Sequence, residues 1–305
     1  MMTTNGEASN RHNAAPGQAQ AVSGCRLVTE WEIIGRARLD GDDRSNVDGL
    51  RRACEAAERL DLKLELDEAD HLDRPIHFLA VAGNDVIGYA GLTPGDEAEA
   101  CGMVHPSWRR RGVGTTLLAN LRAAALDLSR ESILVICEDA APAALAWMRR
   151  LGATLESAER RMIVRLATAT DVPATADVPL ELRRATEADH DTVAALLGEE
   201  FTDYPEEERL VGLDVDVVIG TLRLTESSHR TMIYGFVIDE QRRGKRLGTR
   251  MLAAVMARLR EEGVIEVGLE VDPENTPAVR LYERFGFRTV TTYRYMRLCV
   301  PTNLS

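Results

Sequence analysis

The chain has 305 residues, of which 45% are hydrophobic and 28% are charged, and its formal net charge is −12. This composition is ordinary for a soluble globular protein, and the length favours two domains. The acidic balance argues against general nucleic-acid binding, which needs a basic face. The five scattered cysteines include no C-x-x-C pair, so neither a disulfide framework nor a zinc site is indicated.

The N-terminal residues and the hydropathy pattern indicate the cellular compartment of the protein. No apolar run approaches the ~20 residues that span a bilayer. Residues 1–24 lack the hydrophobic core of a signal peptide, and they are polar and small. We therefore expect a cytoplasmic protein with no membrane partner. Because residues 1–24 have too little apolar surface to bury, they are interpreted as a disordered tail.

Strands and helices alternate in the part that follows. Apolar residues at a spacing of three and four predict helices, and short β-rich runs predict strands. The elements expected first are a strand at 26–34, a helix at 47–62, a hairpin at 77–81 and 86–90, and a strand at 100–104. The hairpin is predicted because Asn84 and Asp85, which favour turns, separate its two apolar runs.

The residues after this strand combine arginine, glycine and threonine at the start of a helix. They are Arg109, Arg110, Arg111, Gly112, Val113, Gly114 and Thr115. The first turn of a helix has unpaired N–H groups and a partial positive charge, and glycine lets a ligand approach the backbone. Arginine adds charge-assisted contacts to phosphate. We call this segment the first cradle, and it predicts an anion-binding site.

A second series of elements follows residues 167–179, which are rich in proline and small polar residues and are interpreted as an extended linker. The elements expected there are a strand at 180–184, a helix at 187–201, strands near 210–215 and 217–224, a strand at 233–238, a helix after residue 246, a strand at 264–271, a helix at 277–285 and a strand at 289–298. This order predicts a mixed α/β fold, α+β-like in its sheet.

The second series contains a second cradle. It consists of Arg243, Gly244, Lys245, Arg246, Leu247, Gly248 and Thr249. Arg109 and Arg243 are 134 positions apart, and the same offset holds without a gap for over forty residues. Chance does not readily produce such a match in the same order of elements. We therefore interpret residues 25–166 and 180–300 as two homologous domains in tandem, here called the first and second halves.

The second cradle resembles the pyrophosphate loop of the GNAT acetyltransferase superfamily, Arg/Gln-x-x-Gly-x-Gly/Ala. It reads Arg243-x-x-Arg246-x-Gly248, with arginine in place of the middle glycine. Asn275 and Tyr282 also match the family segment N-x-x-A-x-x-x-Y-x-x-x-G-F. The resemblance covers both halves and is strongest in the second. It implies two GNAT-type domains, each a mixed twisted sheet flanked by helices.

The resemblance also implies an activity, which is transfer of an acetyl group from acetyl-CoA to the primary amine of a small acceptor. In family members the cradle binds coenzyme A, the asparagine contacts its pantetheine arm, and the tyrosine protonates the departing thiolate. Tyr282 is therefore expected to be the general acid. The expected coenzyme ligands are both cradles, Asn275, Val104, Phe236, Val237 and Ile238.

The two halves differ at the positions that carry the chemistry. In the register of the repeat, Ala141 replaces Asn275 and Met148 replaces Tyr282. A thioether cannot donate a proton. We therefore expect the first half to bind coenzyme through its cradle but to catalyse poorly or not at all.

The sequence leaves the base open. Met232 occupies the strand position where many family members have a glutamate. The remaining candidates for the base are Glu226, His229, Tyr234, Asp239 and Glu270.

The sequence also allows more than one acceptor and more than one function. An acidic cluster at 199–208 favours a cationic acceptor, and a solvated acidic loop explains it equally well. Two other functions are kept as alternatives: a non-catalytic acyl-CoA sensor, and an interaction protein whose first half is a docking scaffold. The protein is expected to be a monomer or a homodimer, with no metal.

Overall fold

The computed structural model describes residues 31–64, 66, 74–93, 95, 97–166, 180–198, 208–227 and 230–301, and the statements below concern these residues. The expected tail, the linker and nearly all of the acidic cluster lie outside them. Within the described part of the chain, no helix is long and apolar enough to cross a membrane.

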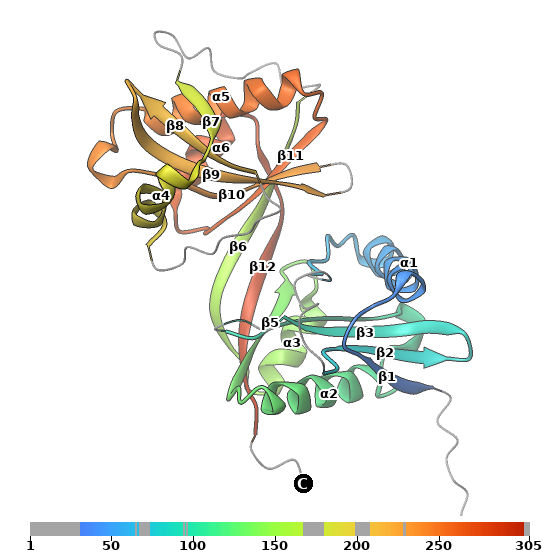
Figure 1. Ribbon diagram of the computed structural model, residues 1–305. Coiled ribbons are helices and arrows are strands. Elements are labelled where there is room, and N and C mark those ends of the chain that lie inside the picture. The colour runs from blue at the N-terminus through green and yellow to red at the C-terminus, as the bar shows by residue number, and fades with distance from the viewer. Residues whose placement is uncertain are drawn as a thin grey trace, which may run out of the picture. The chain divides into compact units, whose positions relative to one another are not determined.

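Helices and strands follow one another in the same order in both halves (Figure 1). The first half contains β1 (Glu32–Arg36), α1 (Gly41–Glu58), β2 (His77–Ala82), β3 (Asp85–Thr93), β4 (Glu99–Val104), α2 (Val113–Asp127), β5 (Ser132–Glu138), α3 (Pro142–Arg150) and β6 (Thr154–Arg165). The second half contains β7 (Glu181–Arg184), α4 (His190–Leu197), β8 (Glu208–Asp214), β9 (Val217–Ser227), β10 (Arg230–Ile238), α5 (Leu247–Glu261), β11 (Glu266–Val271), α6 (Thr276–Arg284) and β12 (Arg288–Cys299). The expected mixed α/β fold is confirmed.

The helices expected at 47–62 and 187–201 run instead from Gly41 to Glu58 and from His190 to Leu197, and local contacts explain one end of each. α1 begins at Gly41 because the Asp40 carboxylate accepts the N–H of Asp43 at 2.8 Å and so caps the helix earlier than residue 47. α4 ends at Leu197, before the expected residue 201, because Gly198 takes a φ of 76° that no helix continues.

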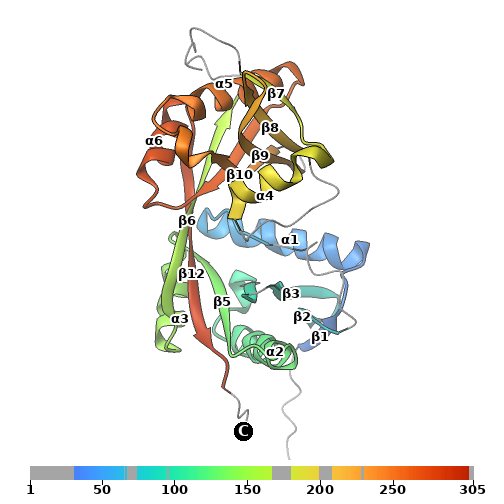
Figure 2. The ribbon, with the colours of Figure 1, turned by 60° about the vertical axis from the view of Figure 1, so that its left-hand side comes forward.

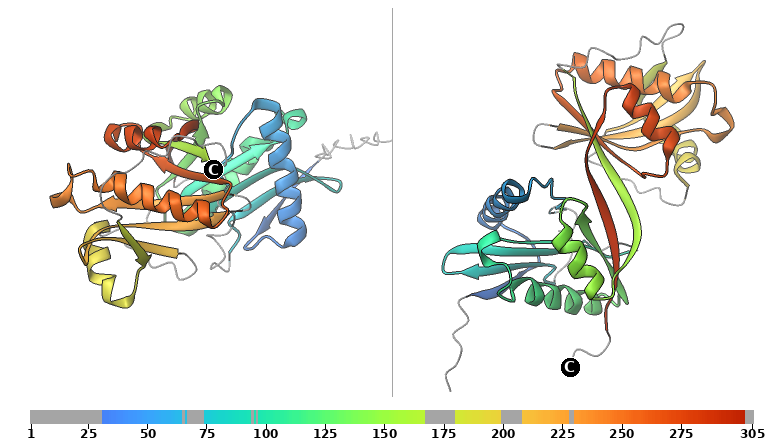
Figure 3. Two further views of the ribbon diagram at one scale, coloured as in Figure 1. Left: turned by 90° about the horizontal axis from the view of Figure 1, so that it is seen from above. Right: turned by 180° about the vertical axis from the view of Figure 1, so that it is seen from behind.

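The twelve described strands form one sheet in the order β1-β2-β3-β4-β5-β12-β6-β11-β10-β9-β8-β7. The closing strands of the two halves are exchanged within it. β12 pairs with β5 and β6 of the first half, and β6 pairs with β11 of the second half. Figure 3 shows β6 and β12 running side by side. Each half thus depends on a strand of the other to complete its hydrogen bonding.

The exchange is nearly symmetric. On the β6–β12 ladder, Glu159 lies opposite Tyr293. These two residues are 134 positions apart, which is the offset of the sequence repeat. A residue that pairs with its own counterpart marks a pseudo-two-fold axis, because a two-fold axis exchanges equivalent positions. The halves therefore meet as two subunits of a symmetric dimer would.

The hydrophobic cores follow the exchanged strands. Met162 and Val164 of β6 are buried in the core of the second half, together with Tyr282 and other residues of α6. Met296 and Leu298 of β12 are buried in the core of the first half. Within the first half, α1 and α2 cover opposite faces of β2–β4 (Figure 2). Burying each large apolar side chain is worth ~1.5–3 kcal/mol, so either half alone loses several such contributions.

We expect neither half to fold alone. A fragment of residues 31–166 would leave one edge of β5 and both edges of β6 unpaired and would expose the core that Met296 and Leu298 cover. Circular dichroism and size-exclusion chromatography of this fragment should show an unfolded or aggregated chain. The control is the whole chain cleaved at a protease site placed within 167–179, which should stay folded as a two-fragment complex. Cooperative melting of the isolated fragment would contradict this view of the exchange.

Candidate active site

The two cradles share one backbone path. In the first cradle, the left-handed positions are Arg110 (φ 62°) and Gly112 (φ 88°). In the second they are Gly244 (φ 81°) and Arg246 (φ 58°), 134 positions further on. Each cradle therefore keeps glycine at one left-handed position and places arginine at the other. Arg246 does not alter the loop, although a left-handed non-glycine residue costs ~1–2 kcal/mol.

Both cradles lead into a helix start that no described side chain caps. α2 begins directly after Gly112 and α5 directly after Arg246, and among the described residues neither receives a side-chain cap. The first-turn N–H groups can therefore meet an anion. The Nε of Arg109 donates to the carbonyl of Val104 at 3.0 Å, and the Nε of Arg243 donates to the carbonyl of Ile238 at 3.4 Å. The remaining cradle cations are Arg110, Arg111, Lys245 and Arg246, all exposed. This donor set fits a pyrophosphate.

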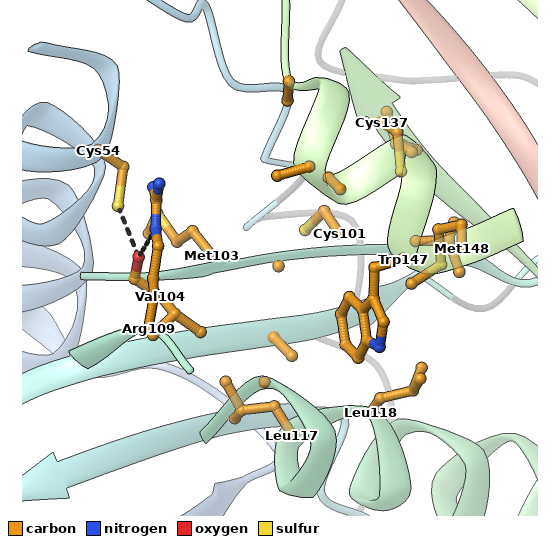
Figure 4. A pocket seen from close by; sticks show the side chains of 18 of the residues that line it. Cys54, Cys101, Met103, Val104, Arg109, Leu117, Leu118, Cys137, Trp147 and Met148 are labelled. Carbon is orange, nitrogen blue, oxygen red and sulfur yellow. Dashed lines mark hydrogen bonds between the residues drawn. The ribbon is translucent and has the colours of Figure 1, made fainter. Parts of the chain in front are cut away.

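A cavity of about 620 Å³ lies beside the first cradle (Figure 4). β4 and β5 pair as parallel strands only from Glu99 opposite Leu134 to Ala100 opposite Val135, and the cavity opens where they separate. Its lining runs from the cradle, with Arg109, Gly114 and Thr115, to apolar side chains such as Met103, Leu117 and Trp147. The cavity thus joins an anion-binding end to an apolar interior.

The first-half cavity has no proton donor on α3. Met148 is 2% exposed and packs in the core, and Ala141 precedes α3 without capping it. Burial raises the pKa of the Cys137 thiol to about 12, so this group stays protonated at neutral pH. Glu138 is the titratable group that the sequence reasoning missed.

Glu138 ends β5 and is 4% exposed. Its Oε1 accepts the N–H of Asp61 at 2.7 Å. Its Oε2 and the hydroxyl of Thr291 on β12 are both buried. Desolvation raises the pKa of Glu138 to about 7, with a smaller upward contribution from the Asp61 carboxylate, whereas the N–H of Asp61 and the Thr291 hydroxyl both act to lower this pKa.

Tyr282 lies on the buried face of α6. It is 6% exposed, and its ring centroid is 6.4 Å from that of Phe236 and 5.8 Å from that of Phe287. Phe236 lies in a bulge of β10 between Tyr234 and Val237, where Gly235 has a φ of 54°. Burial raises the pKa of Tyr282 to about 12, so the hydroxyl keeps its proton at neutral pH and can donate it.

The other expected coenzyme ligands lie around the same strand end. Phe236, Val237 and Ile238 form the half-buried end of β10. Asn275 caps α6, since its Oδ1 accepts the N–H of Ala278 at 3.2 Å, and this leaves the amide NH2 group to donate elsewhere. The structure therefore brings Tyr282, the end of β10 and the second cradle to one end of the parallel pair β10–β11.

Two of the base candidates are engaged in other roles. Burial alone would raise the pKa of Glu270, but Lys63 at 2.8 Å and Arg161 at 2.8 Å outweigh burial and hold this pKa below its usual value. Glu270 is therefore ionised and a poor proton acceptor. Asp239 caps the turn before the cradle, because its Oδ1 accepts the N–H of Gln241 at 3.0 Å.

The remaining three base candidates lie on β9, on β10 and between these two strands in the sequence. Tyr234 lies against the guanidinium of Arg223, whose Cζ is 5.1 Å from the ring centroid. His229 lies outside the described residues, and Glu226 lies on β9 opposite Thr231. Among the described residues, no group of three or more His, Cys, Asp or Glu side chains is placed to hold a metal ion.

Sequence reasoning missed Lys63 as well as Glu138. Lys63 is 13% exposed and contacts Glu270, a residue of the other half. A signal existed, because the chain has only two lysines, Lys63 and the cradle residue Lys245, against 35 arginines. For Glu138 the sequence carries no such signal, since its burial depends on β12.

Comparisons with known proteins agree with this geometry. A profile of the acetyltransferase (GNAT) family matches residues 44–153 and again residues 179–287. A mycothiol acetyltransferase of Thermobispora bispora is 31% identical over 67% of this chain and 77% of its own length. A mycothiol acetyltransferase of Sanguibacter keddieii is 28% identical over 81% of this chain and 91% of its own length.

Two solved structures are similar in fold. A GCN5-related N-acetyltransferase from Sphaerobacter thermophilus superposes with a TM-score of 0.72 at 20% identity, covering 90% of this chain and 98% of that one. A tandem GNAT protein from the clavulanic acid biosynthesis pathway superposes with a TM-score of 0.66 at 18% identity, covering 90% of this chain and 99% of that one. The similarity in fold therefore extends across nearly all of both neighbours.

Replacing Arg246 with glycine should stabilise the protein. Arg246→Gly removes the backbone strain of an arginine in the left-handed region. We therefore expect the free energy of unfolding in urea to rise by ~0.5–1 kcal/mol. The matched control is Gly244→Ala, which introduces a side chain at a φ of 81° and should lower it by about 1 kcal/mol. A destabilised Arg246→Gly variant would show that the arginine side chain, and not its backbone, determines stability here.

Glu138 should make stability depend on pH. Its folded-state pKa of about 7 lies above the unfolded value of ~4.3, so its contribution is fully present below pH ~4.3 and is lost as the pH rises through 7. Relative to Glu138→Gln, the wild type should lose roughly 2–3 kcal/mol of unfolding free energy between pH 5 and pH 8. Urea titrations of both proteins at several pH values measure the difference. Parallel stability curves would mean that Glu138 is hydrated in solution.

Proposed function

The chain belongs to the GNAT acetyltransferase family, and on that premise we propose that its second half transfers an acetyl group from acetyl-CoA to the primary amine of a small acceptor. The observation that carries the proposal is the meeting of three features in one half: an uncapped helix start behind a left-handed cradle, a bulged strand end, and a buried tyrosine that keeps its proton. The first half has the cradle without the tyrosine.

The second cradle fits the phosphates of the coenzyme. The free N–H groups of the first turn of α5 would receive them, and Arg243 and Lys245 would add charge. The half-buried end of β10 would hold the pantetheine arm through backbone groups that the bulge releases from β9. Acetyl-CoA supplies the acetyl group as a thioester.

Tyr282 would act on the sulfur of that thioester. Its hydroxyl would donate a proton as the carbon–sulfur bond breaks, because a thiolate expelled beside the Tyr282 ring, which packs against Phe236 and Phe287, is poorly solvated. The raised pKa of Tyr282 keeps the hydroxyl protonated at neutral pH. The attacking amine must itself lose a proton, which water in the open site would take up. Glu270 is a weak acceptor for it, because Lys63 and Arg161 hold the pKa of its carboxyl below the usual value.

The first half would bind coenzyme without transferring the acyl group. Its cradle has the same left-handed path as the second, and the adjoining cavity of about 620 Å³ has an apolar interior. Met148 occupies the place of the tyrosine and cannot donate a proton.

For the acceptor, the relatives give the first candidate. The mycothiol acetyltransferases match this chain over both halves, so we propose the amine that those enzymes acetylate as the first acceptor to test. A cationic acceptor remains our broader proposal, based on the acidic residues around 199–208.

A non-catalytic sensor is the second candidate. The observation in its favour is that Met232 is buried where a glutamate is common in the family and that Glu270 is neutralised by ion pairs. A sensor has no use for a proton donor, so the role of Tyr282 separates the two functions.

Removing the Tyr282 hydroxyl should slow transfer strongly while preserving coenzyme binding. We expect Tyr282→Phe to lower kcat by ~10²-fold or more, the usual contribution of a general acid, with coenzyme affinity within about twofold of wild type. Release of free thiol from acetyl-CoA across a panel of amines gives kcat, and calorimetry gives affinity. The matched control is Met148→Leu in the first half, which should leave kcat unchanged. Unchanged turnover in Tyr282→Phe would remove the tyrosine from the mechanism, and no turnover by wild type on any amine would favour the sensor.

A further inference from the structure

The segment of residues 58–63, which we call the strap, leaves the end of α1 and forms one wall of the first-half cavity. α1 ends at Glu58, and Arg59 closes the helix with a φ of 57°. In the extended chain that follows, side chains alternate. Leu60 and Leu62 line the cavity, whereas Asp61 and Lys63 contact residues of the central strands. The strap therefore has one face toward the cavity and one toward the exchanged strands.

Two contacts hold the cavity-facing side of the strap, one near the first cradle and one at the inner end of the cavity. At the cradle end, the Glu58 carboxylate lies 2.8 Å from Nη2 of Arg109, the arginine that opens the first cradle. At the inner end, the N–H of Asp61 donates to Oε1 of Glu138 at 2.7 Å. A ligand that fills the cavity would therefore lie next to both the Glu58–Arg109 ion pair and the Asp61–Glu138 hydrogen bond.

On the other side, the strap is held by the second half. The Lys63 ammonium donates to Oε2 of Glu270 on β11 and to the hydroxyl of Tyr295 on β12, both at 2.8 Å. A third oxygen, Oε2 of Glu159 on β6, is 3.4 Å away. Three oxygens match the three N–H groups of an ammonium, and the planar fork of arginine would not meet them.

Glu270 connects this contact to the proposed catalytic site. β10 and β11 pair as far as Ile233 opposite Leu269, and Glu270 is the next residue of β11. Glu270 thus lies at the point where β10 and β11 separate, next to the strand end that is proposed to hold the coenzyme. A shift of Lys63 would act on the geometry of that opening.

The two cradle arginines differ in a way that concerns the strap. Arg243 pairs with Glu240 of its own turn at 3.3 Å, and Glu240 is 84% exposed. Arg109 instead pairs with a carboxylate from α1, and the two side chains are 35% and 30% exposed. A phosphate group at the first cradle would compete with Glu58 for Arg109 and repel the Glu58 carboxylate. A half-exposed pair of this kind is weak, so a doubly charged pyrophosphate displaces it.

We propose that the first-half cavity is a regulatory site for a pyrophosphate-bearing ligand of the coenzyme A type, and that the strap couples its occupancy to the second half. The inference rests on the proposed function for the identity of the catalytic half. Glu58 and a phosphate group would compete for Arg109, so that filling the cavity exchanges one partner of Arg109 for the other. Leu60 and Leu62 of the strap touch the cavity, and Lys63 of the strap contacts Glu270 of the second half. Through these contacts a change at the first cradle would reach the second half.

Each site can be given its own fluorescent reporter. Trp147 lines the first-half cavity and lies 3.5 Å from the Cβ position of Gly114. Leu281, 134 positions further on, lies 3.6 Å from the Cβ position of Gly248.

Trp108 stacks on Arg111 of the first cradle, so it is replaced by Phe together with Trp31 in both reporters. With Trp31 and Trp108 replaced, Trp147 reports the first site. Leu281→Trp, in a background where Trp147 is replaced by Phe as well, reports the second. Both are titrated with free coenzyme A, which carries no acyl group, so that binding is read without turnover.

Variants of the strap then separate binding from coupling. Glu58→Gln should tighten coenzyme binding at the first site about two- to fivefold, because the competing charge is gone. Lys63→Met should leave first-site binding intact and abolish the effect of first-site occupancy on the second-site Kd. The matched control is Glu240→Gln, which removes the exposed partner of Arg243 and should leave both the first-site Kd and the coupling unchanged.

Lys63→Met leaves Glu270 with one cationic partner and is checked for folding by its melting temperature. Tyr295→Phe, which removes one of the three Lys63 contacts, serves as the milder variant. Hydrogen exchange of the wild-type strap amides, with and without coenzyme A, provides a measurement that needs no substitution. Protection at residues 60–63 should change when the first site fills.

The outcomes are distinct. No response of Trp147 up to millimolar coenzyme A, with a responding Leu281→Trp reporter, would overturn the first site. Responses at both sites with a second-site Kd that is the same in wild type, Glu58→Gln and Lys63→Met would overturn the coupling. Coupled binding at both sites without turnover on any amine would support this inference and remove the proposed transfer reaction.

Discussion

The exchange of β6 and β12 between the halves is the constraint on which the rest of the structure depends. β12 lies between β5 and β6, and β6 lies between β12 and β11, so the backbone N–H and C=O groups of each closing strand find their partners in the other half. Buried backbone groups must be paired, and this requirement fixes the relation between the two halves. The pairing of Glu159 with Tyr293 places the pseudo-two-fold axis at the middle of this ladder.

The two halves share this symmetric backbone arrangement but differ in side chains, and these differences separate the proposed catalytic half from the other. Tyr282 occupies the second half, and Met148 the equivalent place in the first. The central sheet face also carries an ionic cluster in which Lys63 and Arg161 neutralise Glu270. A buried carboxylate without partners is costly, so cations from the first half are what allow an acidic residue on β11. The second half is therefore incomplete without the first, both in hydrogen bonding and in charge.

The cradles show how one backbone requirement accepts two solutions. A phosphate-binding turn needs two left-handed residues, and the chain meets this need with Arg110 and Gly112 in one half and with Gly244 and Arg246 in the other. A left-handed arginine costs ~1–2 kcal/mol, and each cradle bears this cost once while a hydrogen bond such as that from Arg243 to Ile238 contributes to holding the turn. A pattern that demands glycine at both positions would overlook either copy.

The sequence by itself determined the local and the repeated features of this protein. Hydrophobic periodicity placed most helices and strands, and the 134-residue offset revealed the tandem repeat, because both depend only on spacing along the chain. Tyr282 and the cradles could be named because their motifs are contiguous. Only the tertiary structure decided the strand exchange, the burial of Glu138 and the contact of Lys63 with Glu270. These join residues that are far apart in sequence, and their energies arise from burial and pairing that no local pattern encodes.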